Sequence, residues 1–333
     1  MRIEEFLLDS DSKRTPTDLT SPDEIPQPPL IETIARDVDV CTSHEPPPPD
    51  EIPVPPPIET VTESVGIHHH HDRLEPGPDG QTQKSAPYIA FEHVFKSFGS
   101  LTVLDDVSFF VLPGETLCIL GRSGVGKSVS LQQIMGFLKP DSGKILVAGE
   151  NIAGYEEEQM QVVRKKVTMV FQNGALFDSL TVGENVAFPL RERGELIEDQ
   201  IVQIVNGLLE MVGVAGMADM LPSDLSTGMK RSVAIARALS SQPEAILYDE
   251  PTTMVDPLMG RLLGNLIQKL KYQLKLTSIV VTHDMRLAQK LADRVLFLHE
   301  AKAHFFGTTA EMEKSQDPVI RQFLELDALV LPA

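Results

Sequence analysis

From about residue 88 onward, the chain alternates short apolar runs with polar turns. Residues 89–98 (IAFEHVFKSF) and 101–112 (LTVLDDVSFFVL) are rich in valine and phenylalanine, which is typical of β-strands. Three further runs are compact and apolar: 114–121 (GETLCILG), 243–251 (PEAILYDEP) and 276–284 (LTSIVVTHD). Such runs are typical of strands buried on both faces. Because these three end in glycine or polar residues, they predict an α/β sheet with a ligand site at the carboxyl ends of its strands.

Other stretches repeat their apolar residues at helical spacing. Residues 184–190 (ENVAFPL), 197–214 (IEDQIVQIVNGLLEMVGV) and 317–326 (DPVIRQFLEL) therefore predict helices. The expected parts are an antiparallel β portion near 88–115, an α/β core of 88–172 and 238–310, and a helical subdomain of about 173–237.

Composition changes sharply near Pro87. Residues 1–86 hold 15 of the 25 prolines, one aromatic residue (Phe6), and 18 acidic against 6 basic residues, a net charge of −12. Such a segment cannot bury enough apolar surface to offset the entropy lost on ordering. We therefore predict a disordered, acidic, proline-rich tail at 1–86 and a folded domain at 87–333.

The tail contains an imperfect duplication. Residues 23–38 (DEIPQPPLIETIARDV) return as residues 50–65 (DEIPVPPPIETVTESV). Two copies are too few for a solenoid, which needs about three stacked units. A duplicated polyproline-type spacer is our first interpretation, and a bivalent docking peptide is the alternative. We interpret the HHHH run at 68–71 as solvated, because no carboxylate or cysteine frames it at ligand spacing.

Charge and cysteine content narrow the function classes. The formal net charge of −19 argues against nucleic-acid binding, which needs clustered lysine and arginine. Two cysteines, Cys41 and Cys118, are too few for a disulfide framework and favour a reducing compartment. The first residues (MRIEEFLLDSDSKR) carry acids where a secretory signal carries bases. No run of about 18 uncharged apolar residues occurs, so we expect any membrane role to depend on a partner.

A phosphate-binding pattern follows the run at 114–121. Residues 121–128 (GRSGVGKS) match G-x-x-x-x-G-K-[ST] at every position. Glycines let successive backbone N–H groups point at phosphate oxygens, and the following helix adds its positive end. Lys127 supplies a catalytic positive charge and Ser128 a hydroxyl for Mg²⁺. A chance glycine-rich turn is the alternative, which the strand–loop–helix context disfavours. The expected ATP-binding residues are Gly121, Arg122, Ser123, Gly124, Val125, Gly126, Lys127 and Ser128.

Two carboxylates end the run at 243–251. Asp249 at a strand end can hold Mg²⁺ through water, and Glu250 can take the catalytic role of polarising the water that attacks the γ-phosphate. A helix N-cap with a solvated neighbour is the alternative, since Pro251 follows. After a phosphate-binding loop, we interpret the pair as the partner of that loop.

Five segments occur in the order found in ATP-binding-cassette (ABC) ATPases. They are GRSGVGKS (121–128), VFQNGALFDSLTV (170–182), LSTGMKRSVAIARAL (225–239), ILYDEPTT (246–253) and VVTHD (280–284). The chain therefore resembles this family over roughly 88–323. The resemblance implies a P-loop NTPase fold with a RecA-like core, an antiparallel β portion and a helical subdomain, and it implies hydrolysis of ATP.

The resemblance also implies roles for three further residues. Phe98 matches the aromatic residue that stacks on adenine, with a core position as the alternative. Gln172 matches the glutamine that reaches Mg²⁺ and the attacking water, where the cassette meets its membrane partner; a surface amide is the alternative. His283 matches the histidine that contacts the γ-phosphate, and a loop histidine with internal partners is the alternative.

The family signature, usually LSGGQ, reads LSTGM here. The resemblance implies that Ser226 and Gly228 offer a hydroxyl and an N–H to the γ-phosphate held by a second cassette. Thr227 stands where the family has its first glycine. This matters only if the backbone needs a positive φ, which a β-branched residue resists. We expect ordinary helix-start geometry and a working signature.

A second departure lies in DEPTTMVDP (249–257). The family usually has Gly-Leu before the aspartate, whereas this chain has Met254 and Val255 and retains Asp256 in the loop that crosses the dimer interface. Because each signature serves the ATP of the other subunit, we expect two copies to form a two-fold symmetric nucleotide-sandwich dimer. ATP would close this dimer and hydrolysis would release it.

Residues 174–192 (GALFDSLTVGENVAFPLRE) and the ending 305–327 (FFGTTAEMEKSQDPVIRQFLELD) resemble the ATPases of the Mla class of lipid-asymmetry, MCE-associated transporters. This resemblance implies a phospholipid-transport ATPase, peripheral on the cytoplasmic face of the inner (plasma) membrane. The implied partners are a polytopic permease, an MCE-type lipid-binding protein and, in some systems, a STAS-domain regulator.

Three alternatives remain open from sequence. A soluble ABC ATPase acting on nucleic acid or ribosomes is disfavoured by the single uninterrupted cassette and the acidic balance. A non-hydrolysing, ATP-gated interaction subunit is favoured by Thr227, Met254 and Val255 but disfavoured by Glu250 and His283. An ABC importer ATPase for another substrate class is the third.

Overall fold

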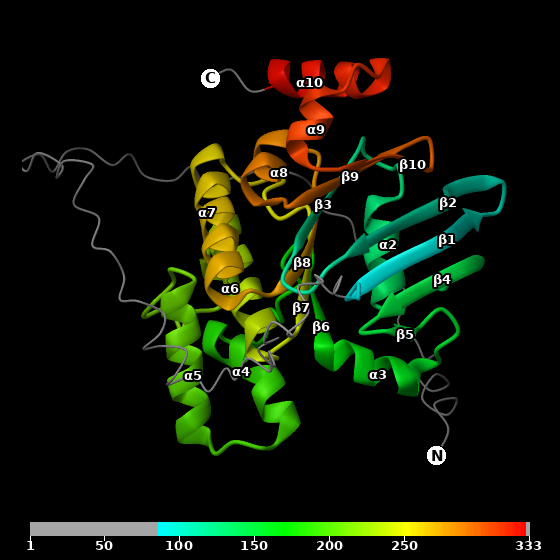
Figure 1. Cartoon of the computed structure of the whole chain (residues 1–333). Coiled ribbons are helices and arrows are strands. Elements are labelled where there is room, and N and C mark those ends of the chain that lie inside the picture. The colour runs from blue at the N-terminus through cyan, green and yellow to red at the C-terminus, as the bar shows by residue number, and fades with distance from the viewer. Residues whose placement is uncertain (1–85, 331–333) are drawn as a thin grey trace, which may run out of the picture. The chain divides into compact units, whose positions relative to one another are not determined.

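The computed structural model describes residues 86–330. This part of the chain consists of two β-sheets and the helices around them (Figure 1). The duplicated segment, the HHHH run and Cys41 of the predicted tail lie outside the described residues. The α/β class predicted from the apolar runs is confirmed.

The larger sheet has six strands and is mostly parallel. In spatial order its strands are β10 (Lys302–Gly307), β9 (Arg294–His299), β3 (Thr116–Leu120), β8 (Thr277–Val281), β7 (Ala245–Asp249) and β6 (Val167–Val170). The β9–β10 pair is antiparallel and the other pairs are parallel. The three compact apolar runs of the sequence are β3, β8 and β7, which lie next to one another. Their carboxyl ends therefore meet at one edge of the sheet.

Alternate residues of the central strands belong to two separate hydrophobic cores. On β3, Leu117 and Ile119 pack into one core, while Cys118 and Leu120 pack into the other. Successive side chains of a strand point to opposite faces, so a strand covered on both faces is apolar throughout. This accounts for the compact runs in the sequence. Burial raises the pKa of the Cys118 thiol to about 12, so this residue packs as a small hydrophobe.

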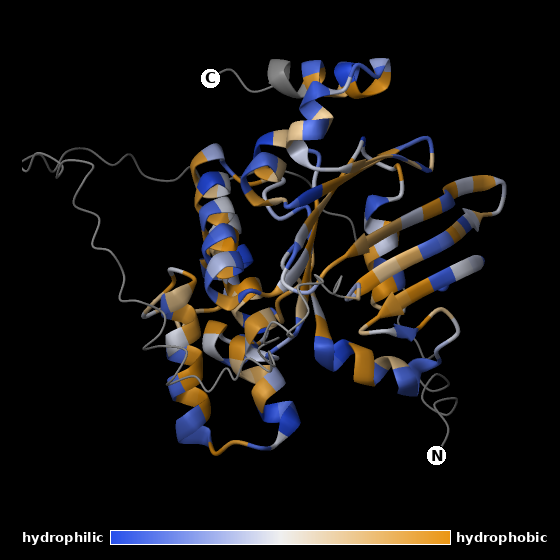
Figure 2. Ribbon diagram, in the orientation of Figure 1, coloured by the Kyte–Doolittle hydropathy of each residue, from blue (hydrophilic) through white to orange (hydrophobic). Residues whose placement is uncertain are grey.

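The smaller sheet has four antiparallel strands and covers one of these cores. In spatial order its strands are β2 (Leu101–Val111), β1 (Ile89–Phe98), β4 (Ser142–Val147) and β5 (Glu150–Asn151). Its inner face includes Phe91 and Phe109, whose rings stack at 4.5 Å. Figure 2 shows hydrophobic and hydrophilic stretches alternating along β1, β2 and β4, as expected of a sheet with one buried face. The predicted range of 88–115 located β1 and β2 but not β4 and β5, which pair with β1 and β4 from later in the chain.

Between β6 and β7 the chain is helical. The helices there are α4 (Val182–Arg193), α5 (Glu198–Met211) and α6 (Thr227–Ser240), with a short 3-10 helix, η2 (Pro222–Asp224), before α6. Helix α5 buries Ile201, Ile204, Val205 and Leu208. This spacing of three and four residues forms the apolar stripe that the sequence showed. Helix α4 begins with a reciprocal capping box between Thr181 and Glu184.

The remaining helices are α2 (Lys127–Ile134), α3 (Glu157–Lys166), α7 (Pro257–Leu274), α8 (Met285–Leu291), α9 (Thr309–Lys314) and α10 (Pro318–Val330). The helix predicted at 317–326 is confirmed as α10. Its start is capped by Asp317, whose Oδ1 accepts the N–H groups of Val319 (2.8 Å) and Ile320 (3.2 Å). Among residues 86–330, no helix has the length and apolarity needed to cross a bilayer.

Candidate active site

The loop 121–126 joins the end of β3 to the first turn of α2. Its φ angle is 150° at Gly121 and 106° at Gly126, a region that other residues resist. A Cβ atom at Gly126 would also lie 2.7 Å from the backbone oxygen of Val103. No side chain caps α2 at Gly126. The first N–H groups of the helix are therefore available to an anion, together with the positive end of the helix dipole.

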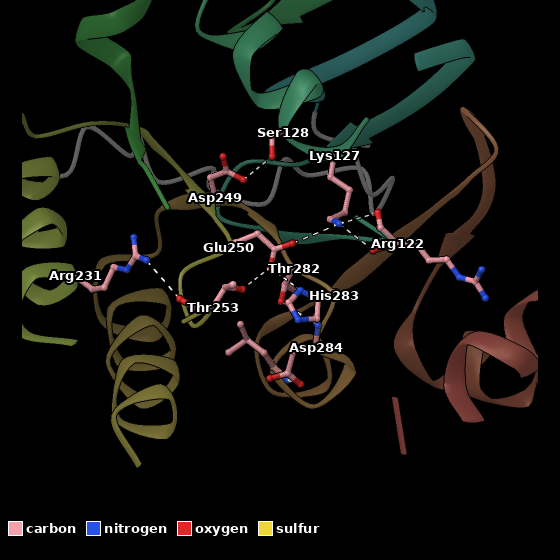
Figure 3. A network of polar contacts seen from close by, with 12 residues as sticks. Arg122, Lys127, Ser128, Arg231, Asp249, Glu250, Thr253, Thr282, His283 and Asp284 are labelled. Atoms are coloured by element: carbon pink, nitrogen blue, oxygen red, sulfur yellow. Dashed lines mark hydrogen bonds and ion pairs between the residues drawn. The ribbon is translucent and has the colours of Figure 1, made fainter. Parts of the chain in front are cut away.

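Lys127 is the first residue of α2 and is 5% exposed. Its Nζ atom donates to the carbonyl oxygens of Gly121 (2.9 Å) and Arg122 (3.1 Å), and it lies 3.4 Å from Oε1 of Glu250 (Figure 3). The loop carbonyls thus hold the ammonium group inside the curve of the loop. A buried cation in this position attracts phosphate oxygens strongly, because little water screens it.

A hydroxyl and a carboxylate meet beside this loop. Ser128 Oγ donates to Asp249 Oδ1 at 2.8 Å, and Asp249 ends β7 (Figure 3). Burial raises the pKa of the Asp249 carboxyl, and the hydrogen bond from Ser128 opposes that shift. Within the described residues, no group of three or more His, Cys, Asp or Glu side chains is arranged as a metal site. Mg²⁺ keeps water and phosphate ligands and needs only one or two protein oxygens, so this pair fits it.

The Glu250 carboxylate is held by three side chains. Its Oε2 atom accepts a hydrogen bond from Thr253 Oγ1 (2.9 Å) and lies 2.9 Å from Nδ1 of His283, while Oε1 faces Lys127. Its backbone has a φ of 46°, a left-handed conformation that is uncommon for a residue with a side chain. A strained backbone of this kind persists only where the contacts around it hold it in place, which is often the case at active sites.

The pKa values of this cluster shift in opposite directions. Burial alone raises the pKa of the Glu250 carboxyl, but the hydrogen bond with His283 and the charges of His283 and Lys127 bring it below its ordinary value. The hydrogen bond to Glu250 raises the pKa of His283, although partial burial opposes this. Glu250 is therefore an ionised base at neutral pH, beside a histidine that keeps its proton to higher pH than usual.

We expect the His283–Glu250 pair to make stability depend on pH. Because the pKa of His283 is raised in the folded chain, its stabilisation is complete below the ordinary value of about 6.5 and is lost as pH rises through the raised value. The imidazole is 58% exposed, so solvent screening keeps the effect to about 2 °C. Melting temperatures of wild type and His283→Gln should therefore differ most near pH 6 and converge toward pH 9. The difference should vanish in a Glu250→Gln background, and a gap that stays constant with pH would contradict the pairing.

One cavity of about 600 Å³ collects most of the predicted site residues. Those that line it are Gly121, Arg122, Ser123, Gly124, Gly126, Lys127, Ser128, Gln172, Glu250 and His283. Asp249 is not among these lining residues but accepts a hydrogen bond from Ser128, which is. Val125 lines a neighbouring hollow that shares Val103 and Gly124 with the cavity. The structure thus brings the loops after β3, β6, β7 and β8 and the start of α2 to one place.

Phe98 is not among the cavity-lining residues. It ends β1, the residue is 47% exposed, and Lys96 Nζ lies 5.4 Å from the centre of its ring. The alternative of a core position does not describe it, because nearly half of the residue is exposed, and its contact with adenine stays a prediction.

The signature residues lie outside this cavity. Ser226 is exposed and caps α6, its Oγ accepting the N–H of Met229 at 3.3 Å. Thr227 is the first residue of α6 and does not have a positive φ, so the expected helix-start geometry is confirmed. Gly228 is buried under Met259, whose Cε would lie 2.6 Å from a Cβ atom at position 228. The contact leaves little room for a larger residue than glycine there.

The loop before α7 combines a cap with a strained residue. Asp256 Oδ1 accepts the N–H groups of Leu258 (3.0 Å) and Met259 (3.1 Å). Met254 has a φ of 61° and is 84% exposed. A left-handed backbone costs a residue other than glycine about 1 kcal/mol. The glycine that the family usually has there would avoid this cost.

Sequence reasoning missed several residues of the site. Arg231 is buried beside it and donates to the carbonyl oxygens of Phe171 (3.0 Å) and Thr253 (3.4 Å), which ties α6 to the loops after β6 and β7 (Figure 3). In the sequence, the only indication that Arg231 belongs to the site is its position in the basic run after the signature. Thr253 lines the cavity next to Glu250, and Phe323 and Leu326 line it from α10. Neither Phe323 nor Leu326 is close in sequence to one of the five motif segments, so the sequence did not indicate that they line the cavity.

Comparison with known proteins identifies the family. The ABC transporter family profile matches residues 104–253. The chain is 38% identical over 260 residues to Protein TRIGALACTOSYLDIACYLGLYCEROL 3, chloroplastic, of Arabidopsis thaliana, covering 73% of this chain and 75% of that protein. It is 40% identical over 227 residues to the intermembrane phospholipid transport system ATP-binding protein MlaF of Haemophilus influenzae, covering 68% of this chain and 86% of that protein. The dimeric post-hydrolysis structure of the ATP-binding cassette MJ0796 with ADP and Pi has a TM-score of 0.62 at 30% identity, covering 66% of this chain and 98% of that one.

Together with these relatives, the phosphate-binding loop and the carboxylate pair at the same edge of the sheet define a nucleotide-hydrolysing cassette. The chain belongs to the ATP-binding subunits of the ABC transporter family. It is therefore an ATPase whose nucleotide is ATP. The predicted fold class and the predicted ATPase activity are both confirmed.

Proposed function

We propose that this ATPase powers the transport of a phospholipid or a related hydrophobic substrate between membranes. The observation that carries the proposal is the 40% identity to a phospholipid-transport ATP-binding protein over 86% of that protein's length. The name of the Arabidopsis relative is that of a glycosylated diacylglycerol, which is also a lipid. Lipid is therefore the substrate class that these relatives favour.

We assign the phosphate contacts to the loop 121–128. Its N–H groups and Lys127 would hold the β- and γ-phosphates, since they converge on the cavity. Ser128, Asp249 and Gln172 would hold Mg²⁺, which when bound offsets the negative charge of the phosphate oxygens.

Glu250 is proposed as the base that takes the proton from the attacking water. Its lowered pKa keeps the carboxylate ionised, and its contacts with Thr253 and His283 fix its orientation. His283 would also reach the γ-phosphate, because it lines the same cavity. Lys127 would move its charge from Glu250 toward the phosphates, which leaves Glu250 a more available base.

We further propose that two copies form a dimer around two ATP molecules. The exposed Ser226, with Gly228 at the start of α6, would serve the nucleotide of the other copy, because neither residue lines the cavity of its own chain. Asp256 caps α7 from the same loop that carries Thr253 and would lie at the same interface. The dimeric structure of a related cassette supports this arrangement.

A polytopic permease, an MCE-type lipid-binding protein and, in some systems, a STAS-domain regulator are the proposed partners. The proposed location is the cytoplasmic face of the inner (plasma) membrane. The phospholipid-transport relative supports both proposals through its membership of an intermembrane transport system.

Isolation of the intact membrane complex that contains this chain would test the proposal. We expect phospholipid to co-purify, and we expect ATP to drive transfer of fluorescent phospholipid between donor and acceptor liposomes once the complex is reconstituted. Transfer should stop when the complex carries Glu250→Gln, which serves as the matched control. A complex that hydrolyses ATP but neither carries nor transfers lipid would contradict the proposal and favour an importer of another substrate class.

A further inference from the structure

Arg231 is a buried cation that lies between the signature and the catalytic carboxylates. It is 4% exposed and belongs to the second turn of α6, the helix that Ser226 caps. In Figure 3 its side chain extends from α6 toward Thr253, and Thr253 lies next to Glu250. Arg231 therefore occupies the place where the helical segment between β6 and β7 meets the loops that carry the site.

The guanidinium group of Arg231 bonds to two backbone carbonyls from different loops. Its Nη1 atom donates to the oxygen of Phe171 at 3.0 Å, and its Nη2 atom donates to the oxygen of Thr253 at 3.4 Å. The hydroxyl of Thr253 in turn donates to Oε2 of Glu250 at 2.9 Å. Thr253 thus connects the arginine to the carboxylate, with its carbonyl on one side and its hydroxyl on the other.

Stability does not account for a positive charge at this position. Burial lowers the pKa of Arg231, and the charge of Asp249 offsets this shift only in part. Among residues 86–330, the buried Nε atom of Arg231 has no hydrogen-bond partner. A buried cation held in this way costs free energy that a well-packed apolar side chain does not. The arginine is therefore explained by the two carbonyls that its planar fork holds in place.

A second contact joins α6 to the loop that follows Glu250. Met259, in the first turn of α7, covers Gly228 so closely that its Cγ would lie 3.2 Å from a Cβ atom at position 228. The loop and the start of α7 are thus held to α6 at two points, Gly228 and Arg231. Because packed contacts transmit displacement, a shift of α6 also shifts Thr253.

We propose that Arg231 is a positioning residue for ATP hydrolysis, which aligns Glu250 through Thr253. The bond to Phe171 anchors the guanidinium group, and the longer bond to Thr253 sets the loop that presents Glu250. Hydrogen bonds of catalytic groups are often long before substrate is bound and shorten afterwards. Arg231 thereby makes the alignment of the base depend on the position of the signature helix. This inference rests on the proposed role of Glu250 as the base.

Arg231→Met should lower kcat for ATP hydrolysis at least about tenfold, because rate falls steeply when a catalytic group is misplaced. The KM and the Kd for ATP should stay within about twofold, since Arg231 does not line the ATP cavity. The melting temperature should fall by no more than about 3 °C, because methionine fills much of the volume and removes a buried charge. Arg231→Lys keeps the charge but not the fork, and should lose nearly as much kcat. Phosphate release, calorimetry and thermal melting of the intact chain would measure these effects.

Arg237→Met is the matched control. Arg237 also lies on α6, burial also lowers its pKa, and it also donates to two carbonyl oxygens, those of Ala175 (2.8 Å) and Gly174 (3.2 Å). Neither of these two residues bonds to Glu250, whose partners are Thr253, His283 and Lys127. We therefore expect Arg237→Met to leave kcat within about threefold of wild type.

A Glu250→Gln background separates this inference from the proposed role of Glu250. If Arg231 acts through Glu250, Arg231→Met should lower the remaining rate of Glu250→Gln by less than about twofold. A loss of the same size in both backgrounds would overturn the inference, and so would equal losses for Arg231→Met and Arg237→Met. Rescue of kcat by Arg231→Lys would also overturn it, because charge and not position would then be the cause. A wild-type rate for Glu250→Gln alone would instead overturn the role of Glu250, and this inference with it.

Discussion

Glu250→Gln should lower the rate of ATP hydrolysis at least about 100-fold, because it removes the base that is poised to take a proton from the attacking water. The amide keeps the shape of the side chain and can still accept the hydrogen bond from Thr253, so the fold of the loop should survive. It also removes the negative charge that faces Lys127 at 3.4 Å. Lys127 is then free to pair with phosphate, and we expect ATP binding to be equal or tighter.

Steady-state phosphate release and ATP binding by calorimetry would measure the two effects separately. Glu244→Gln is a matched control, because this exposed glutamate precedes β7 and lies outside the cavity. It should leave the rate within about twofold of wild type. Equal rates for Glu250→Gln and wild type would instead favour the non-hydrolysing interaction subunit that the sequence left open.

Mixing two inactive variants should restore ATP hydrolysis if the signature acts on the partner's nucleotide. Lys127→Ala removes the phosphate contact of one chain, and Ser226→Asp places a negative charge at the signature while keeping a good N-cap for α6. Each variant alone has two defective sites per dimer. A mixed dimer has one site in which both elements are intact. We therefore expect each parent below about 1% of the wild-type rate and the mixture at up to about a quarter of it, given random pairing and one working site in two.

Ser226→Asn is the control for the signature variant, since it also caps α6 but adds no charge. Its activity should exceed that of Ser226→Asp clearly. If the signature acted within its own chain, the mixture would stay at the level of its parents. If turnover needs two intact sites, the mixture will not regain hydrolysis, and ATP binding is measured instead. With Glu250→Gln added to both variants, mixed dimers should retain labelled ATP, whereas dimers of either variant alone should not.

The sequence predicted those parts of the site whose conformation is determined by residues adjacent in the chain. The loop 121–126 follows β3 and precedes α2, and its glycine angles and helix N-terminus are local properties. Asp249 and Glu250 end a buried strand, so a parallel sheet carries them to the same edge as that loop. Helix α5 was equally visible, because its buried stripe recurs at helical spacing.

Other features have no local signal. The strand β4 pairs with β1, although β2, β3 and α2 separate the two strands in the sequence. The short apolar run of β4 does not indicate which of the two sheets it joins. The positive φ of Met254 is set by the surrounding loop and not by the residue type, which disfavours a left-handed backbone. Phe98 matches a family position, yet its ring is exposed next to Lys96, because the strand end and its neighbours decide where it points.

The amino-acid sequence by itself determined the phosphate-binding loop, the carboxylate pair and the helical segment, because spacing along one segment specifies each of them. The cassette class followed from the resemblance of five ordered segments to ABC ATPases. Only the tertiary structure decided which side chains complete the cavity. Thr253 and His283 meet at Glu250, Arg231 ties the signature helix to the neighbouring loops, and α10 brings Leu326 to the ATP site. The physical reason is that these contacts join segments far apart in the chain, and their positions follow from how two hydrophobic cores pack on opposite faces of one sheet.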